Sequence, residues 1–164
     1  MRFVKSSNPF FQVRNINEIP IVNMHESVLG RKKPRYRNEQ DEQPLVILIR
    51  GLPGGGKSTL AESLVPHGYR HFETDKFFER NGIYKPDPSK LVDAHAWCLN
   101  LVERTLFMKQ KVVVSNTFSQ LKEMQPYLNL ASSVLVVEVG GGWESIHEIS
   151  TNQKMKIAKR WESL

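Results

Sequence analysis

One octapeptide, GLPGGGKS at residues 51–58, contains most of the candidate functional residues of this chain. Two glycines that enclose four residues, followed by Lys and Ser, match the nucleotide phosphate-binding pattern G-x-x-x-x-G-K-[ST] in full. Glycines let backbone N–H groups approach phosphate oxygens, and the following helix adds the positive end of its dipole. Lys57 can reach the β and γ phosphates, and the Ser58 hydroxyl can ligate Mg²⁺, a hard ion that prefers oxygen.

The segments around this loop fit the same interpretation. Residues 45–49 (LVILI) form a short continuous apolar run, as a buried parallel strand does, and residues 58–65 can form a helix that stops at Pro66. A glycine-rich turn with a stray lysine is the alternative, and the flanking strand and helix argue against it. We therefore predict that ATP is bound through Gly51, Leu52, Pro53, Gly54, Gly55, Gly56, Lys57, Ser58 and Thr59.

Asp75 is the second candidate for chemistry. It follows a predicted strand at residues 69–73 and opens a predicted helix at residues 75–79, on the edge where parallel sheets bind ligands. A carboxylate there could take the proton from an attacking hydroxyl, or hold a Mg²⁺-bound water. The alternative is an ordinary first-turn acid stabilised by the helix dipole, and position alone does not separate the two.

Ser115, Asn116 and Thr117 close the predicted strand at residues 111–115 and should also face the phosphates. Their polar groups can hydrogen-bond an acceptor or a metal-bound water, so we assign them to the acceptor side. Phosphate-loop enzymes often carry a metal-supporting acid at such a strand end, and this strand ends without one. Polar capping of the next helix is the alternative.

A basic helix is predicted at residues 152–163, and it carries Lys154, Lys156, Lys159 and Arg160. A lid that closes on a triphosphate brings positive charge to the γ phosphate. Lys154, Lys156 and Arg160 are therefore lid candidates. A charged face turned toward solvent is the alternative.

These residues need a scaffold that brings strand ends together, and the pattern from Leu45 onward supplies one. Predicted strands at residues 45–49, 69–73, 111–115 and 133–139 alternate with predicted helices. Such alternation predicts an α/β fold of the P-loop NTPase type, with a parallel sheet of about four to five strands and helices on both faces.

The first part of the chain differs in composition from the rest. Residues 1–43 hold eight Lys/Arg and five Asp/Glu and lack periodicity, so we predict a basic, partly disordered N-terminal extension, followed by a P-loop kinase-like domain at residues 44–164. The net charge of +6 is shared equally by the two parts, at +3 each. It is compatible with a polyanionic partner and equally with a solvated basic surface.

Composition excludes several classes of protein. No apolar run approaches the roughly eighteen residues of a membrane span, so no membrane partner is expected. The start of the chain lacks the apolar region of a secretory signal, and we expect a cytoplasmic location. Cys98 is the single cysteine, so no internal disulfide can form.

The chain resembles the small phosphate-loop kinases related to the kinase domain of phage polynucleotide kinase. The matching stretches run in the same order over nearly all of residues 45–162, and include LVILIRGLPGGGKSTLAESL, FETDKFF, AHAWC, VVVSNTF and EMQPYLNLA. The resemblance implies transfer of a phosphoryl group from ATP to a hydroxyl, as at the 5′ end of a nucleic acid. It also implies that Lys57 and Ser58 bind phosphate and Mg²⁺, that Asp75 is the general base, and that Ser115 to Thr117 line the acceptor side.

Two departures from the family pattern keep other functions open. Phe77 and Phe78 follow the candidate base, so Arg80 is the first arginine after it, and no arginine precedes Arg160 in the lid segment. The alternatives are a small-molecule kinase on the same scaffold and a non-catalytic ATP-binding regulator. The sequence predicts nucleotide and nucleic acid ends as partners and gives no oligomeric state.

Overall fold

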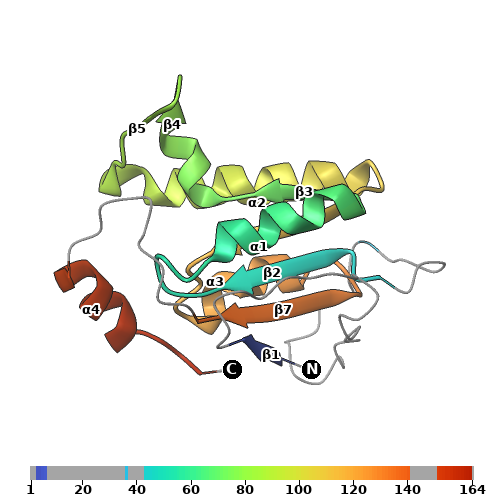
Figure 1. Ribbon diagram of the computed structural model, residues 1–164. Helices are drawn as coiled ribbons and strands as arrows, with labels where there is room; N and C mark the ends of the chain where they lie inside the picture. Colours follow the sequence, from blue (N-terminus) through green and yellow to red (C-terminus); the bar gives the residue numbers. More distant parts are fainter. Residues whose placement is uncertain (1–2, 7–35, 37–42, 141–150, 164) are drawn as a thin grey trace.

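A five-stranded parallel sheet forms the centre of the structure, a computed structural model that describes residues 3–6, 36, 43–140 and 151–163. The strand order is β1-β7-β2-β6-β3 (Figure 1). The strands of the sheet are β1 (Phe3–Ser6), β2 (Val46–Arg50), β3 (Tyr69–Phe72), β6 (Lys111–Asn116) and β7 (Val134–Val139). This arrangement confirms the predicted α/β fold with a parallel sheet.

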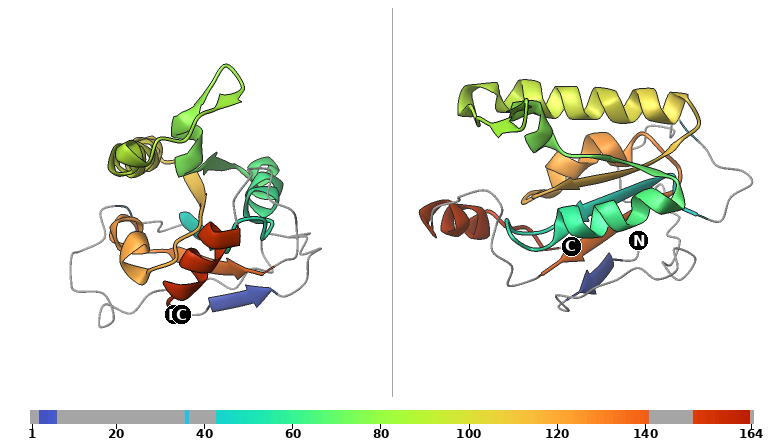
Figure 2. Two further views of the ribbon diagram at one scale, coloured as in Figure 1. Left: turned by 90° about the vertical axis from the view of Figure 1, so that its left-hand side faces the viewer. Right: turned by 45° about the horizontal axis from the view of Figure 1, so that its top comes forward.

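Helices cover both faces of the sheet, as the alternating pattern predicts. One core cluster packs α1 against the sheet, and the other packs α2 and α3 against the opposite face (Figures 1 and 2). The helices are α1 (Lys57–Leu64), α2 (Leu91–Phe107), α3 (Leu121–Leu128) and α4 (Thr151–Lys159). Short 3₁₀ turns occupy Val65–His67, Thr74–Phe78 and Pro88–Lys90, and β4 (Glu79–Arg80) pairs with β5 (Ile83–Tyr84) in a separate antiparallel hairpin.

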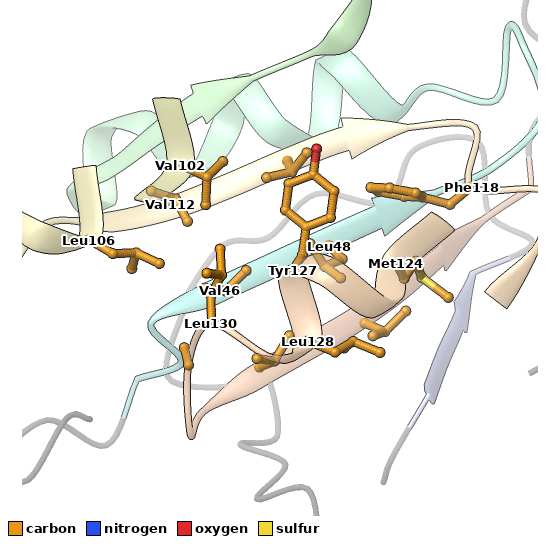
Figure 3. Packing of buried hydrophobic residues seen from close by; sticks show 14 of the residues in the cluster. Val46, Leu48, Val102, Leu106, Val112, Phe118, Met124, Tyr127, Leu128 and Leu130 are labelled. Carbon is orange, nitrogen blue, oxygen red and sulfur yellow. The ribbon is translucent and has the colours of Figure 1, made fainter. Parts of the chain in front are cut away.

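The apolar runs of the strands divide between the two faces because successive side chains of a strand point in opposite directions. On β2, Val46 and Leu48 join the cluster under α2 and α3, whereas Ile47 and Ile49 join the cluster under α1. Figure 3 shows the cluster under α2 and α3, in which Tyr127 packs among valines and leucines. All four residues of β2 named here are fully buried, so the strand that carries the phosphate loop is fixed from both sides.

The carboxyl ends of the strands meet at one edge of the sheet. In the register of the ladders, Arg50 lies opposite Asn116 on one side and Glu138 on the other. The loop that follows β2 leads into α1 at this same edge, and α4 and the β4–β5 hairpin lie at this end of the molecule too (Figures 1 and 2). The fold therefore brings segments that are distant in the sequence to one place.

The sheet takes its edge strand from the segment predicted to be an N-terminal extension. Phe3–Ser6 pairs in parallel with β7, and Tyr36 pairs with Ala131. Local sequence gave no sign of either pairing. Residues 7–35 and 37–42 lie outside the described residues, so the predicted disorder and the boundary at residue 44 stay predictions.

Two predicted helices differ from the observed elements. The segment after β3 is a 3₁₀ helix, Thr74–Phe78, because the chain must turn within a few residues to begin the hairpin at Glu79. The terminal helix α4 ends at Lys159, after which the backbone N–H of Glu162 donates to the carbonyl of Ser119, between β6 and α3 (2.9 Å). Among the described residues, no helix has the length and apolar character needed to cross a membrane.

Candidate functional site: a phosphate-binding loop and the strand ends beside it

The loop at residues 51–58 adopts a conformation that depends on glycine. A Cβ atom on Gly51 would lie 2.6 Å from the carbonyl oxygen of Val139, closer than real contacts allow. Gly56, which precedes the first residue of α1, has φ of 83°, in the left-handed region that other residues rarely adopt. The loop therefore turns tightly into α1, and the N–H groups at the start of that helix point into the loop, as phosphate binding requires.

Lys57 is the cation of this loop. Its Nζ donates a hydrogen bond to the carbonyl oxygen of Leu52 (3.0 Å), so the side chain folds back over the loop. Burial lowers the pKa of Lys57, and the negative charges of Asp75 and Glu73 oppose part of that effect. Lys57 thus faces two carboxylates that come from the segment after β3.

Glu73 accepts hydrogen bonds from three side chains at this edge. Ser115 Oγ donates to Glu73 Oε1 (2.7 Å), His71 Nε2 lies 3.1 Å from the same oxygen, and Ser58 supplies the third hydrogen bond. Burial alone would raise the pKa of Glu73, but these hydrogen bonds outweigh it and lower the pKa to about 2. Glu73 is therefore an ionised carboxylate at neutral pH, and hydrogen bonding from the Ser58 hydroxyl of the phosphate-loop motif contributes to its low pKa.

His71 holds Glu73 from the side of the sheet. Its Nδ1 lies 2.8 Å from Glu62 Oε1, and its Nε2 lies 2.7 Å from Ser115 Oγ. Burial would lower the pKa of His71, but the hydrogen bonds to Glu73 and Glu62 outweigh it and raise the pKa above its ordinary value. The imidazole ring thus links a carboxylate on α1 to the carboxylate at the end of β3.

Asp75 lies two residues beyond Glu73, in a different environment. It is exposed, on the 3₁₀ helix Thr74–Phe78, and the Tyr84 hydroxyl of β5 donates a hydrogen bond to it. Burial and the charge of Asp75 both raise the pKa of Tyr84. The backbone N–H of the preceding Thr74 donates to Asn116 Oδ1 at the end of β6 (2.9 Å), so Asp75 lies at the edge of the sheet that carries the loop. The charge of Asp75 opposes the lowering of the Lys57 pKa by burial.

The three residues assigned to the acceptor side lie at the end of β6, and each contacts a neighbouring segment. Ser115 is buried and donates to Glu73, and Asn116 Oδ1 accepts the backbone N–H of Thr74 (2.9 Å). The carbonyl of Thr117 accepts the N–H of Gly51 (3.4 Å). These residues hold the β3 and β6 ends against the loop, and their role toward an acceptor stays a prediction.

The lid candidates lie on α4 and just beyond it, at the carboxyl edge of the sheet (Figures 1 and 2). The side chains of Lys156 and Arg160 are exposed, and within the described part of the chain no ion pair or side-chain hydrogen bond joins them to the loop. The side chain of Lys154 lies outside what the structure describes. Lid closure by these residues therefore stays a prediction.

The segment after α4 contacts the residue that immediately precedes the loop. Arg50 is fully buried, its Nη2 donates to the carbonyl of Glu162 (2.8 Å), and its guanidinium lies 4.1 Å from the centre of the Trp161 ring. Its Nη1 lies 3.8 Å from Glu138 Oε2 on β7. The C-terminal segment is thus anchored at the base of the phosphate loop.

Four residues of this edge, Arg50, His71, Glu73 and Tyr84, have contacts that sequence analysis did not predict. One local signal exists for two of them. Side chains two residues apart in an extended chain lie on the same face, so the sequence predicts that His71 and Glu73 point to the same side of the sheet. Their partners come from α1 and β6, and only the fold shows those contacts.

Oxygen donors of the kind that Mg²⁺ prefers lie at this edge, namely the Ser58 hydroxyl of the loop and the Glu73 carboxylate, whose pKa is lowered by hydrogen bonding from Ser58. The described residues contain no group of three or more His, Cys, Asp or Glu that could hold a metal ion by themselves. Mg²⁺ in such sites is bound by one or two protein oxygens together with substrate phosphates and waters. The donor set therefore fits Mg²⁺ that arrives with a nucleotide.

A glycine loop of this geometry, at the end of a central parallel strand and leading into a helix, defines a kinase-like P-loop protein that binds nucleotides. Comparison with known families agrees, since a family model described as an AAA domain matches residues 46–144. The chain belongs to this family.

Two individual proteins are similar to the chain. NEDD4-binding protein 2 from Homo sapiens is 38% identical over 164 residues, and the match covers 90% of this chain and 9% of that much longer protein. Among solved structures, a gluconokinase from Sinorhizobium meliloti 1021 is 19% identical, covers 73% of this chain and 76% of its own, and superposes with a TM-score of 0.47.

Proposed function

We propose that the chain is an ATP- and Mg²⁺-dependent phosphotransferase that moves the γ-phosphoryl group of ATP to a hydroxyl, with a polynucleotide 5′-hydroxyl as the acceptor. One observation carries the proposal. Asp75 is exposed and follows Thr74, whose backbone N–H donates to Asn116 Oδ1 (2.9 Å) at the end of β6, beside the strand β2 that leads into the loop. A phosphate-binding lysine and a solvent-facing base thus share one edge of the sheet, where an acceptor can reach both.

Each residue has a definite task in this reaction. The loop amides and Lys57 hold the β and γ phosphates, and Ser58 would hold Mg²⁺. Mg²⁺, when bound, neutralises charge on the phosphate oxygens. The acceptor oxygen forms a new bond to the γ phosphorus as the bond to the β-phosphate oxygen breaks, ADP leaves, and Asp75 takes the proton. The Tyr84 hydroxyl orients Asp75 for this step.

The acceptor enters from the side of Asp75 and the β4–β5 hairpin. Arg80 on β4 is exposed, in the position where a basic side chain can meet an acceptor phosphate. The resemblance of the sequence motifs to polynucleotide kinases supports a polyanionic acceptor, and the net charge of +6 is compatible with one. The predicted cytoplasmic location is compatible with this substrate.

Transfer of labelled phosphate tests the proposal. The protein is mixed with γ-labelled ATP, Mg²⁺ and oligonucleotides that end in a 5′-hydroxyl, and matched oligonucleotides that already carry a 5′-phosphate serve as the control. We expect label on the 5′-hydroxyl strands alone and none with Lys57→Ala. Absence of label from protein that binds ATP would contradict the nucleic-acid acceptor.

A panel of small hydroxyl compounds in the same assay separates the remaining functions. Label on one of these compounds and not on the oligonucleotides would replace the proposed acceptor by a small molecule. Tight ATP binding with no transfer to any acceptor would instead indicate a non-catalytic nucleotide-binding regulator.

A further inference from the structure

Strand β6 ends without an acid, although P-loop enzymes support their metal with an aspartate at a strand end beside the loop. Ser115 occupies the last buried position of β6, directly opposite Ile49 on β2. A serine hydroxyl can hydrogen-bond, but it brings no negative charge to balance a divalent cation. The end of β6 therefore lacks the negative charge that P-loop enzymes carry at this position.

The missing charge is present one strand away. Ser115 Oγ donates to Glu73 Oε1 at 2.7 Å, and Glu73 also accepts a hydrogen bond from Ser58, the hydroxyl expected to contact Mg²⁺. Glu73 follows β3, which pairs with β6 on the side away from β2. The longer glutamate side chain thus reaches from the neighbouring strand to the loop.

We propose that Glu73 is the metal-supporting carboxylate of this site, moved from the end of β6 to the end of β3, while Ser115 serves to position it. This inference rests on the proposed function, since it concerns Mg²⁺ bound with ATP. Glu73 is a positioning residue for the metal and its waters, and Asp75 keeps the role of base.

The surroundings of the two acids support this division. The side chain of Glu73 is only 14% exposed and is fixed by His71, whose other nitrogen is fixed by Glu62. Asp75 is exposed and is held by the hairpin residue Tyr84. A metal-supporting group needs a fixed position, whereas a base must be reachable by the acceptor hydroxyl.

Calorimetric titration with ATP, in Mg²⁺ and again in EDTA, tests this role without an activity assay. We expect Glu73→Gln to weaken binding in Mg²⁺ by roughly 10- to 100-fold, the usual cost of losing a group that orients metal ligands. In EDTA the same variant should bind ATP as well as the wild type or better, because a negative charge near the phosphates is gone. Glu79→Gln removes an exposed carboxylate that pairs with Lys76, outside this network, and is the matched control, with an unchanged Mg²⁺ effect.

A second test moves the carboxylate from the end of β3 to the end of β6, and so does not depend on a single variant. Glu73→Ser should lose the Mg²⁺ effect, and Ser115→Asp added to it should restore much of that effect from the end of β6. Thermal melts of all variants show whether each is folded. Restoration in the double variant supports the inference even where Glu73→Gln is destabilised.

Three outcomes would overturn the inference: equal losses in Mg²⁺ and EDTA for Glu73→Gln, an unchanged Mg²⁺ effect in that variant, or no restoration by Ser115→Asp. Each of these leaves ATP binding by the wild type intact, and so leaves the proposed function standing. Failure of the wild type to bind ATP in either buffer would instead remove the proposed function itself.

Discussion

The phosphate loop and the strand ends beside it share one edge of the sheet, yet they are built from different parts of the chain. The loop at residues 51–58 is defined by its backbone, since Gly51 sits against Val139 and Gly56 turns the chain into α1. The ends of β3 and β6 are defined by side chains, with Glu73 bound by Ser115 across 42 residues of sequence.

The contrast between a loop built from backbone groups and strand ends built from side chains indicates a different function for each region. A loop of backbone N–H groups can bind the phosphates of any nucleoside triphosphate, because its hydrogen bonds go to the phosphate oxygens and not to the base. The strand ends hold two acids in unlike environments: the side chain of Glu73 is 14% exposed, whereas Asp75 is exposed. If the loop binds nucleotide and the strand ends direct metal and acceptor, variants in the two regions should have separable effects.

The largest expected effect belongs to the strand-end region. Asp75→Asn should lower the rate of phosphoryl transfer by roughly 10²- to 10⁴-fold, the usual contribution of a general base. ATP affinity measured by calorimetry should stay close to that of the wild type, because the loop is untouched. Unchanged turnover would remove Asp75 as the base, and a parallel loss of affinity would show that the two regions are not separable.

Lys57→Ala is the complementary change in the loop. Loss of a charged hydrogen bond to phosphate costs about 2–3 kcal/mol, so ATP affinity should fall roughly 30- to 100-fold. Calorimetry measures the affinity, and circular dichroism should show the fold unchanged because Lys57 is not among the buried core residues. Wild-type affinity in this variant would mean that nucleotide binds elsewhere.

The Glu73–His71 pair predicts how stability changes with pH. The low pKa of Glu73 stabilises the fold above its ordinary pKa of 4.5, and this contribution is lost as the pH falls toward about 2. The raised pKa of His71 stabilises the fold below its ordinary 6.5, and this contribution is lost as the pH rises through the raised value. The contribution of the pair is therefore complete between these two ordinary values.

Urea unfolding at several pH values measures this effect. Near pH 5.5, Glu73→Gln should lower the free energy of unfolding by on the order of 2–3 kcal/mol, and the difference from the wild type should shrink toward about pH 3. Glu62 is the exposed partner of His71, so Glu62→Gln should lower the free energy of unfolding by less than Glu73→Gln does. A difference that does not change with pH would contradict the ionised pair.

The smallest expected effect concerns the C-terminal segment, whose Trp161 and Glu162 contact Arg50, the residue before the loop. Trp161→Ala removes the ring beside the Arg50 guanidinium and should lower the free energy of unfolding by about 1–2 kcal/mol. Trp161→Phe keeps a ring there and is the control. ATP affinity should change far less than in Lys57→Ala; an equal loss would show that the segment takes part in binding.

The sequence was sufficient to predict the α/β fold class and the position of the loop, because both predictions depend on contiguous residues. The apolar run of β2, the glycines and the first turn of α1 are contiguous, and each restricts the chain by its own sterics. Asp75 and Ser115 could also be assigned to one edge, since carboxyl ends of parallel strands meet there.

The side-chain network could not be predicted because it depends on which strands are neighbours and in what register. Glu73 meets Ser115 only because β3 lies beside β6, and Arg50 meets Trp161 only because the chain returns to the sheet after α4. The edge strand β1 shows the same limit, since its partner β7 follows more than a hundred residues later. Contacts over such separations have no local sequence signature.

Calorimetric titration of the wild-type protein with ATP in Mg²⁺ is the most direct test of the central claim, that the loop at residues 51–58 captures a nucleoside triphosphate. We predict saturable binding of one ATP per chain, lost for the most part in Lys57→Ala and competed by ADP. Absence of binding for both ATP and GTP, from protein that is folded by circular dichroism, would contradict the claim and the functions built on it.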